Sequence, residues 1–209
     1  MRKHPQSRFT PGALAAALAL LAAGGCIGIR PLPRPALQQG FLQRSDFWTG
    51  TAESGGVTLR ARVLASAADS LAVFDADLPS AGILPVFVGL RTTSSAPLSW
   101  QNARFTLQPG GKPVSPVPFE RVQKRLLKRY GVRMYSDAEI EAFRTAFSAL
   151  QLPEGPLDAG REAWGVLYFP IREPKDLDRE LTLGFLGFLG GAEPVRITLR
   201  CPAEAPTDL

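Results

Sequence analysis

Short strand-like segments separated by turn residues dominate the chain from residue 57 onward, and they limit its fold more than any other feature. Residues 57–63 alternate between apolar and polar side chains, as in a strand with one buried face. Residues 83–91 are almost all apolar, which predicts a central strand covered on both faces. Further strands are expected at residues 70–75, 103–107, 163–170, 181–188 and 195–201. About seven short strands with turn signals between them predict a mainly β protein, a two-sheet antiparallel sandwich.

Between the fourth and fifth of these segments the apolar residues recur at helical spacing. They form two stripes, Phe119, Val122, Leu126 and Tyr130 in the first and Ile140, Phe143, Phe147 and Leu150 in the second. Ser136 and Glu139 have the spacing of a capping box, in which both side chains bond to backbone N–H groups at a helix start. We therefore predict an α-helical hairpin at residues 117–152, inserted in a sandwich domain that spans residues 51–209.

Residues 1–25 have the composition of a signal peptide. Arg2, Lys3 and Arg8 precede an apolar run of Ala and Leu at residues 13–23. This run is too short to cross a bilayer, which takes about 20 apolar residues. Its removal lowers the formal net charge from +5 to +2, because the segment holds three basic residues and no acidic ones. A charge this small gives no argument for a nucleic-acid partner.

Small residues directly before Cys26 resemble the end of a bacterial lipoprotein signal peptide: Ala23-Gly24-Gly25-Cys26. The family most often has Leu where this chain has Ala23. The resemblance implies cleavage before Cys26 and lipidation of its thiol, and two or more acyl chains hold a protein stably to a membrane. A secreted protein with an incidental cysteine after its signal peptide is the alternative.

The residues that follow Cys26 favour a tether between the anchor and the domain. Prolines in residues 26–50 favour an extended backbone, which predicts a spacer rather than a recognition ligand. Ile27 stands where Asp would mark inner-membrane retention, so it resembles the outer-membrane sorting pattern. The resemblance therefore implies a cell-envelope location, at the outer membrane facing the periplasm or the cell surface.

The first predicted helix carries the largest local charge imbalance. Its basic residues oppose only Glu120 and are Arg121, Lys124, Arg125, Lys128, Arg129 and nearby Arg133. On a tethered protein such a helix would contact anionic lipid or an acidic polymer, at about 1 kcal/mol per Lys or Arg near the surface. The alternative is a solvated face above a packed apolar stripe, with some charges paired to Asp137, Glu139 and Glu141.

The mature chain offers few residues for catalysis or metal binding. Its one histidine, His4, lies in the signal segment, which excludes histidine-based catalysis and histidine metal sites. With Cys26 lipidated, Cys201 is the one remaining thiol, so we expect no disulfide and no zinc site. Its phase with Ile197 and Leu199 predicts that Cys201 faces the core. We predict no catalytic residue, metal or cofactor, although a distant pair of carboxylates remains open.

The strand segments resemble the immunoglobulin-like domains of bacterial surface lipoproteins. Residues 84–93, 103–107 and 160–170 carry this resemblance, which concerns strand order and texture over residues 55–202. It implies an immunoglobulin-like sandwich and no active site. The Cys-Trp-Cys arrangement of antibody domains is absent from the sequence.

These features favour a lipid-anchored binding or scaffold module without catalytic activity. Its expected partners are the membrane, through the anchor, and an envelope protein or polymer. One alternative is a carrier of lipid or another apolar ligand, which would need a cavity of several hundred Å³ between the sheets. The less favoured alternative is a carboxylate-based glycan hydrolase, which would need converging carboxyl groups with raised pKa values.

Overall fold

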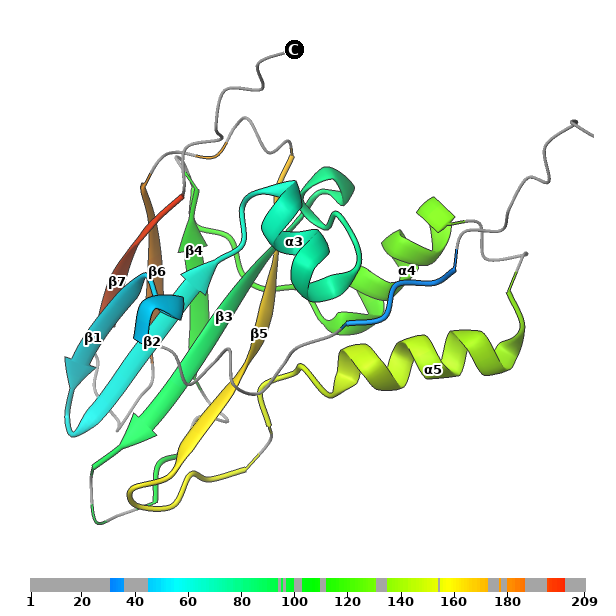
Figure 1. Ribbon diagram of the computed structural model, residues 1–209. Helices are drawn as coiled ribbons and strands as arrows, with labels where there is room; N and C mark the ends of the chain where they lie inside the picture. The colour runs from blue at the N-terminus through cyan, green and yellow to red at the C-terminus, as the bar shows by residue number, and fades with distance from the viewer. Residues whose placement is uncertain are drawn as a thin grey trace, which may run out of the picture. The chain divides into compact units, whose positions relative to one another are not determined.

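Two antiparallel sheets form the framework of the domain (Figure 1). The four-stranded sheet has the order β1-β2-β3-β5, made by Gly50–Ser54, Val57–Val63, Ile83–Thr92 and Glu162–Pro170. The three-stranded sheet has the order β4-β6-β7, made by Arg104–Gln108, Glu180–Leu186 and Val195–Arg200. The mainly β, two-sheet prediction is thus confirmed. This computed structural model describes residues 31–35, 45–93, 95, 97–99, 103–109, 112–130, 135–153, 155–172, 177, 180–186 and 195–201.

Alternating side chains of both sheets fill the space between them and form the first core. Val57, Leu59, Ala61 and Val63 of β2 are all at most 2% exposed and pack in this core, as their period of two requires. The opposing sheet contributes buried residues that include Leu183 and Ile197. The predicted inward face of residues 57–63 is therefore confirmed.

A second core lies on the outer face of the four-stranded sheet, under the helices (Figure 1). β3 supplies both cores, with Leu84 and Val86 facing the other sheet and Ile83 and Phe87 facing the helices. Because both faces of β3 are covered, nearly every residue of this strand is buried. This confirms the central strand that its apolar run predicts.

In the described ranges, three α-helices and two short 3-10 helices contribute to the outer layer. The elements are η1 (Ser45–Phe47), α3 (Ala67–Phe74), η2 (Pro79–Ala81), α4 (Phe119–Tyr130) and α5 (Asp137–Ser148). The predicted hairpin between β4 and β5 is confirmed as α4 and α5, and Ser136 and Glu139 form the predicted capping box. The ring of Phe119 lies 5.6 Å from that of Phe147 between centroids, so the two helices meet through aromatic side chains.

One predicted strand is wrong, and one observed strand was not predicted. Residues 70–74 belong to α3 and Asp75 is its C-cap, and Ser66 caps the start of the helix by accepting a hydrogen bond from the backbone N–H of Asp69. The strand that was not predicted is β1, which spans the expected boundary between the tether and the domain at residues 50 and 51. β1 pairs with β2 through a two-residue turn of Gly55 and Gly56, both with positive φ angles that favour glycine.

The two sheets are in contact along both of their lateral edges, and we call each of these contacts a seam. At one seam a Cβ atom on Gly50 of β1 would collide with the side chains of Ile197 and Leu199 of β7, so the two strands approach closely there. At the other seam Val114 exchanges backbone hydrogen bonds with Leu107 of β4, and the Val117 N–H donates to the Tyr168 carbonyl of β5 at 2.7 Å. The segment that leads into the helical hairpin therefore crosses from one sheet to the other.

The chain order of the strands departs from the constant-type immunoglobulin fold. There the second and third strands lie in opposite sheets. Here β2 and β3 are neighbours in one sheet and α3 connects them. The 4+3 division of strands is nevertheless the same.

Candidate functional site

The basic residues predicted on the first helix gather on one face of α4. The opposite face is buried in the second core through Phe119, Val122, Leu126 and Leu127. The exposed face carries Arg121, Lys124, Arg125, Lys128 and Arg129. We call these five residues the basic face. The sixth predicted residue, Arg133, lies outside the described residues, as does Cys26.

None of the five cations of the basic face forms an ion pair with another described residue. Arg125 is tied to the fold, because its Nη1 donates to the Gly82 carbonyl at 2.8 Å. Two of the three carboxylates considered as partners, Glu139 and Glu141, interact with residues within or beside α5. Glu139 accepts hydrogen bonds from Ser136, which lower the pKa of its carboxyl group, first through the backbone N–H and second through the hydroxyl. Glu141 lies 3.4 Å from Arg144.

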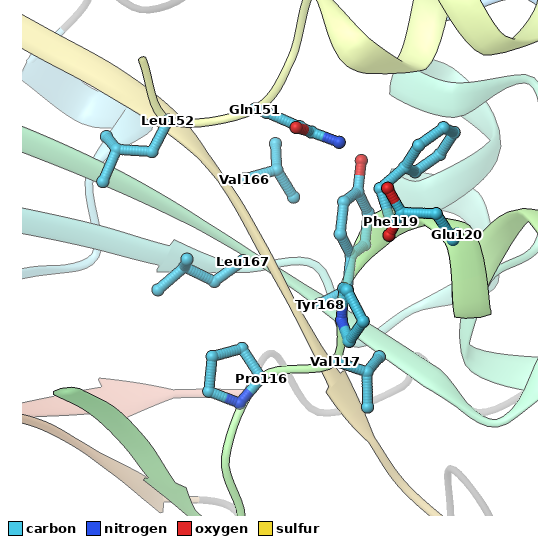
Figure 2. A pocket seen from close by; sticks show the side chains of 10 residues that line it. Pro116, Val117, Phe119, Glu120, Gln151, Leu152, Val166, Leu167 and Tyr168 are labelled. Carbon is cyan, nitrogen blue, oxygen red and sulfur yellow. The ribbon is translucent and has the colours of Figure 1, made fainter. Parts of the chain in front are cut away.

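A pocket that the sequence did not predict lies along the outer edge of β5, where the helical hairpin leaves the sandwich and returns to it (Figure 2). Its volume is about 460 Å³. The residues that line it are Pro116, Val117, Pro118, Phe119, Glu120, Gln151, Leu152, Val166, Leu167 and Tyr168. The pocket therefore lies beside the sandwich, not between the sheets as the carrier alternative required.

Two backbone hydrogen bonds hold the walls of this pocket against β5. The Val117 N–H donates to the Tyr168 carbonyl at 2.7 Å, and the Val166 N–H donates to the Leu150 carbonyl at 2.8 Å. The first bond secures the segment that enters α4, and the second secures the segment that leaves α5. Both roots of the hairpin are thus bonded to the same stretch of β5, with the pocket between them.

The phenol of Tyr168 is the one buried side-chain group among the described residues whose polar atom has no hydrogen-bond partner. Tyr168 is only 2% exposed, and its ring lies 6.3 Å from those of Phe74 and Phe119 between centroids. This burial raises the pKa of the Tyr168 hydroxyl far above its usual range, so the group stays protonated and neutral. An unpaired buried hydroxyl costs stability unless something pairs with it.

The polar groups of the pocket gather at one end. Figure 2 shows the Tyr168 hydroxyl, the Gln151 amide and the Glu120 carboxylate pointing toward the same space. Gln151 and Glu120 are exposed to solvent. On the other side the figure shows Leu152 and Leu167, which make that part of the wall apolar.

The described part of the chain contains no group of three or more His, Cys, Asp or Glu residues placed to hold a metal ion. Among the described residues that line the pocket, Glu120 is the only carboxylate. Cys201 follows β7 and is partly buried against the first core, which agrees with its predicted phase but not with full burial. No helix in the described ranges is long and apolar enough to cross a bilayer.

Comparison with known proteins adds little to this geometry. No protein-family model matches the sequence, and no curated protein is significantly similar to it. Among solved structures, the chain is similar to a functionally unknown protein from Listeria monocytogenes EGD-e. The identity is 12%, the match covers 74% of this chain and 82% of that one, and the TM-score is 0.37. A similarity this weak carries no argument about function.

Proposed function

We propose that this protein is a lipid-anchored component of the cell envelope that acts as a binding or scaffold module and has no catalytic activity. The lipid is attached at Cys26, and the basic face of α4 contacts the anionic headgroups of a membrane. The observation that supports this contact most directly is the set of five exposed cations on one face of α4, none of them paired with a described carboxylate.

The energetics suit a surface contact that assists an anchor. Each Lys or Arg near an anionic membrane contributes about 1 kcal/mol, and salt weakens the attraction. An acyl anchor combined with a basic patch gives more stable attachment than either alone. The outer membrane, facing the periplasm or the cell surface, is the proposed location, based on Ile27.

For the fold, we propose a likeness to immunoglobulin-like domains in architecture but not in chain order. The 4+3 sheets support it, as does the placement of β1 and β2 in the larger sheet and of β6 and β7 in the smaller. The position of β3 beside β2 sets this domain apart from the constant type.

The anchor is tested in the full chain expressed in a bacterium that lipidates proteins. Wild-type protein should partition into detergent and incorporate a clickable fatty acid, and Cys26→Ser should do neither. Fatty-acid labelling of the Cys26→Ser protein would overturn the proposed anchor.

The basic face is tested without the anchor, using the chain from residue 26 with Ser at that position. Leu32–Leu209 forms a compact unit that contains both cores, so this protein should fold. We expect binding to vesicles that contain phosphatidylglycerol, and none to pure phosphatidylcholine. Replacing Arg121, Lys124, Lys128 and Arg129 by Gln should weaken binding more than about tenfold, while Arg125 is kept for its bond to Gly82.

A matched control removes the same charge elsewhere. Arg91, Arg104, Arg161 and Arg196 are exposed and lie outside α4, so their replacement by Gln should leave most vesicle binding intact. Equal losses in the two variants would show that net charge, not the basic face, drives binding. Binding to soluble polyglutamate in preference to vesicles would replace the membrane with an acidic polymer as the partner.

A further inference from the structure

The pocket at the edge of β5 presents two kinds of surface to a ligand. Its polar end holds the buried Tyr168 hydroxyl, which lacks a partner, together with Gln151 and Glu120 (Figure 2). Its other side is lined by the aliphatic side chains of Leu152 and Leu167. A volume of about 460 Å³ falls within the range of small-molecule sites.

The polar groups limit the chemistry of the ligand's head. The neutral Tyr168 phenol both donates and accepts a hydrogen bond, as does the Gln151 amide, whereas an ionised Glu120 only accepts. A wholly apolar ligand would leave the Tyr168 hydroxyl unpaired, and an anionic head would meet the charge of Glu120. A hydroxyl group answers both conditions, because it accepts from Tyr168 and donates to Glu120.

We infer that this pocket binds an uncharged amphipathic small molecule whose hydroxylated head pairs with Tyr168, Gln151 and Glu120. Its apolar part packs against Leu152, Leu167 and the neighbouring Pro116. The inference does not depend on the basic face or on the lipid anchor.

The test uses n-octyl glucoside below its critical micelle concentration as the probe, titrated into the unlipidated chain from residue 26 and followed by calorimetry. We expect saturable binding that Tyr168→Phe weakens about three- to tenfold, the effect of losing one hydrogen bond between neutral groups. Gln151→Ala should weaken binding to a similar extent, and Gln151 is exposed, so this variant should fold. Circular dichroism checks both variants.

Two further comparisons separate the head group from general hydrophobicity. Octanoate should bind more weakly than octyl glucoside, because its carboxylate is repelled by that of Glu120. Glu120→Gln removes this repulsion and should reduce the difference in affinity between the two ligands. Tyr135→Phe is the matched control, because it removes a phenol that donates to the Tyr130 carbonyl outside the pocket. Its affinity for octyl glucoside should equal that of the wild type.

Several results would overturn the inference. One is the absence of saturable binding below the micellar concentration. Another is an affinity for octyl glucoside that is unchanged in both Tyr168→Phe and Gln151→Ala. This result would mean that the ligand's head does not pair with these two side chains, and that water is the partner of the Tyr168 hydroxyl. Tighter binding of octanoate than of octyl glucoside would reject the uncharged head.

Discussion

The two cores of this protein share β3 but differ in composition and in how they are assembled. The first core, between the sheets, contains two aromatic residues among its buried members, Phe169 and Phe185. The second core contains seven: Phe47, Phe74, Phe87, Phe119, Phe143, Phe147 and Tyr168. Aliphatic residues of regular period fill the first, whereas rings from helices, turns and strands meet in the second. Both candidate functional surfaces, the basic face and the pocket, border the second core.

The largest effect should come from opening the aromatic core. Phe147 is fully buried, and its ring lies within 6 Å of those of Phe74, Phe119 and Phe143. Phe147→Ala should lower the free energy of unfolding by about 3–5 kcal/mol, measured by urea denaturation. Leu183→Ala, in the first core, should cost about 2–5 kcal/mol.

The same pair of variants tests whether the cores are separate. Because β3 is covered on both faces, we expect one cooperative transition in each variant, by both tryptophan fluorescence and circular dichroism. Two transitions in Phe147→Ala would show that the sandwich stays folded without the aromatic core, and the two cores would then be independent units.

An intermediate effect is expected at the seam between β1 and β7, which belongs to the first core. A Cβ atom at Gly50 would meet the side chains of Ile197 and Leu199. Gly50→Ala should therefore destabilise the fold by about 1–3 kcal/mol through overpacking, measured by thermal denaturation. The exposed neighbour Thr51 is the control, and Thr51→Ala should change stability by less than about 0.5 kcal/mol. A neutral Gly50→Ala would mean that this seam is looser than the structure indicates.

The smallest effect distinguishes Tyr168, a member of the second core, from Tyr135, which packs against that core. Tyr168→Phe removes an unpaired buried hydroxyl and should raise the free energy of unfolding by up to about 1 kcal/mol. Tyr135→Phe removes a hydroxyl that donates to the Tyr130 carbonyl at 3.3 Å, and should lower it by about 0.5–1.5 kcal/mol. Chemical denaturation of both variants should give opposite signs. A loss in Tyr168→Phe would show that its hydroxyl is paired in solution.

Local pattern in the sequence was enough to predict the first core and the hairpin. Inward residues such as Leu59 follow from a period of two, and the Ser136 capping box marks the start of α5 without any tertiary information. The strand predicted at residues 70–75 was wrong because six residues are too few to distinguish the two-residue period of a strand from the 3.6-residue period of a helix. The signal for a helix stood just upstream, in Ser66 and Asp69.

β1 was missed because it lacks an apolar face. Most of its residues are exposed, and Gly50 has no side chain to pack. The better signal was the Gly55-Gly56 pair, which is typical of a two-residue hairpin turn.

The pocket depends on pairings between distant residues, Val117 with Tyr168 and Leu150 with Val166, and no local pattern encodes these. The one local feature of the sequence that pointed to the pocket was Tyr168, a polar side chain within the otherwise apolar residues 163–170.

The bonding of both hairpin roots to β5 has a thermodynamic consequence. A molecule in the pocket would touch residues before α4 and after α5 together with the strand between them. The free energy of ligand binding would therefore further stabilise the packing of the hairpin against the sheet. By thermodynamic linkage, any contact that stabilises the docked hairpin, including one made through the basic face, would raise the affinity of the pocket for its ligand.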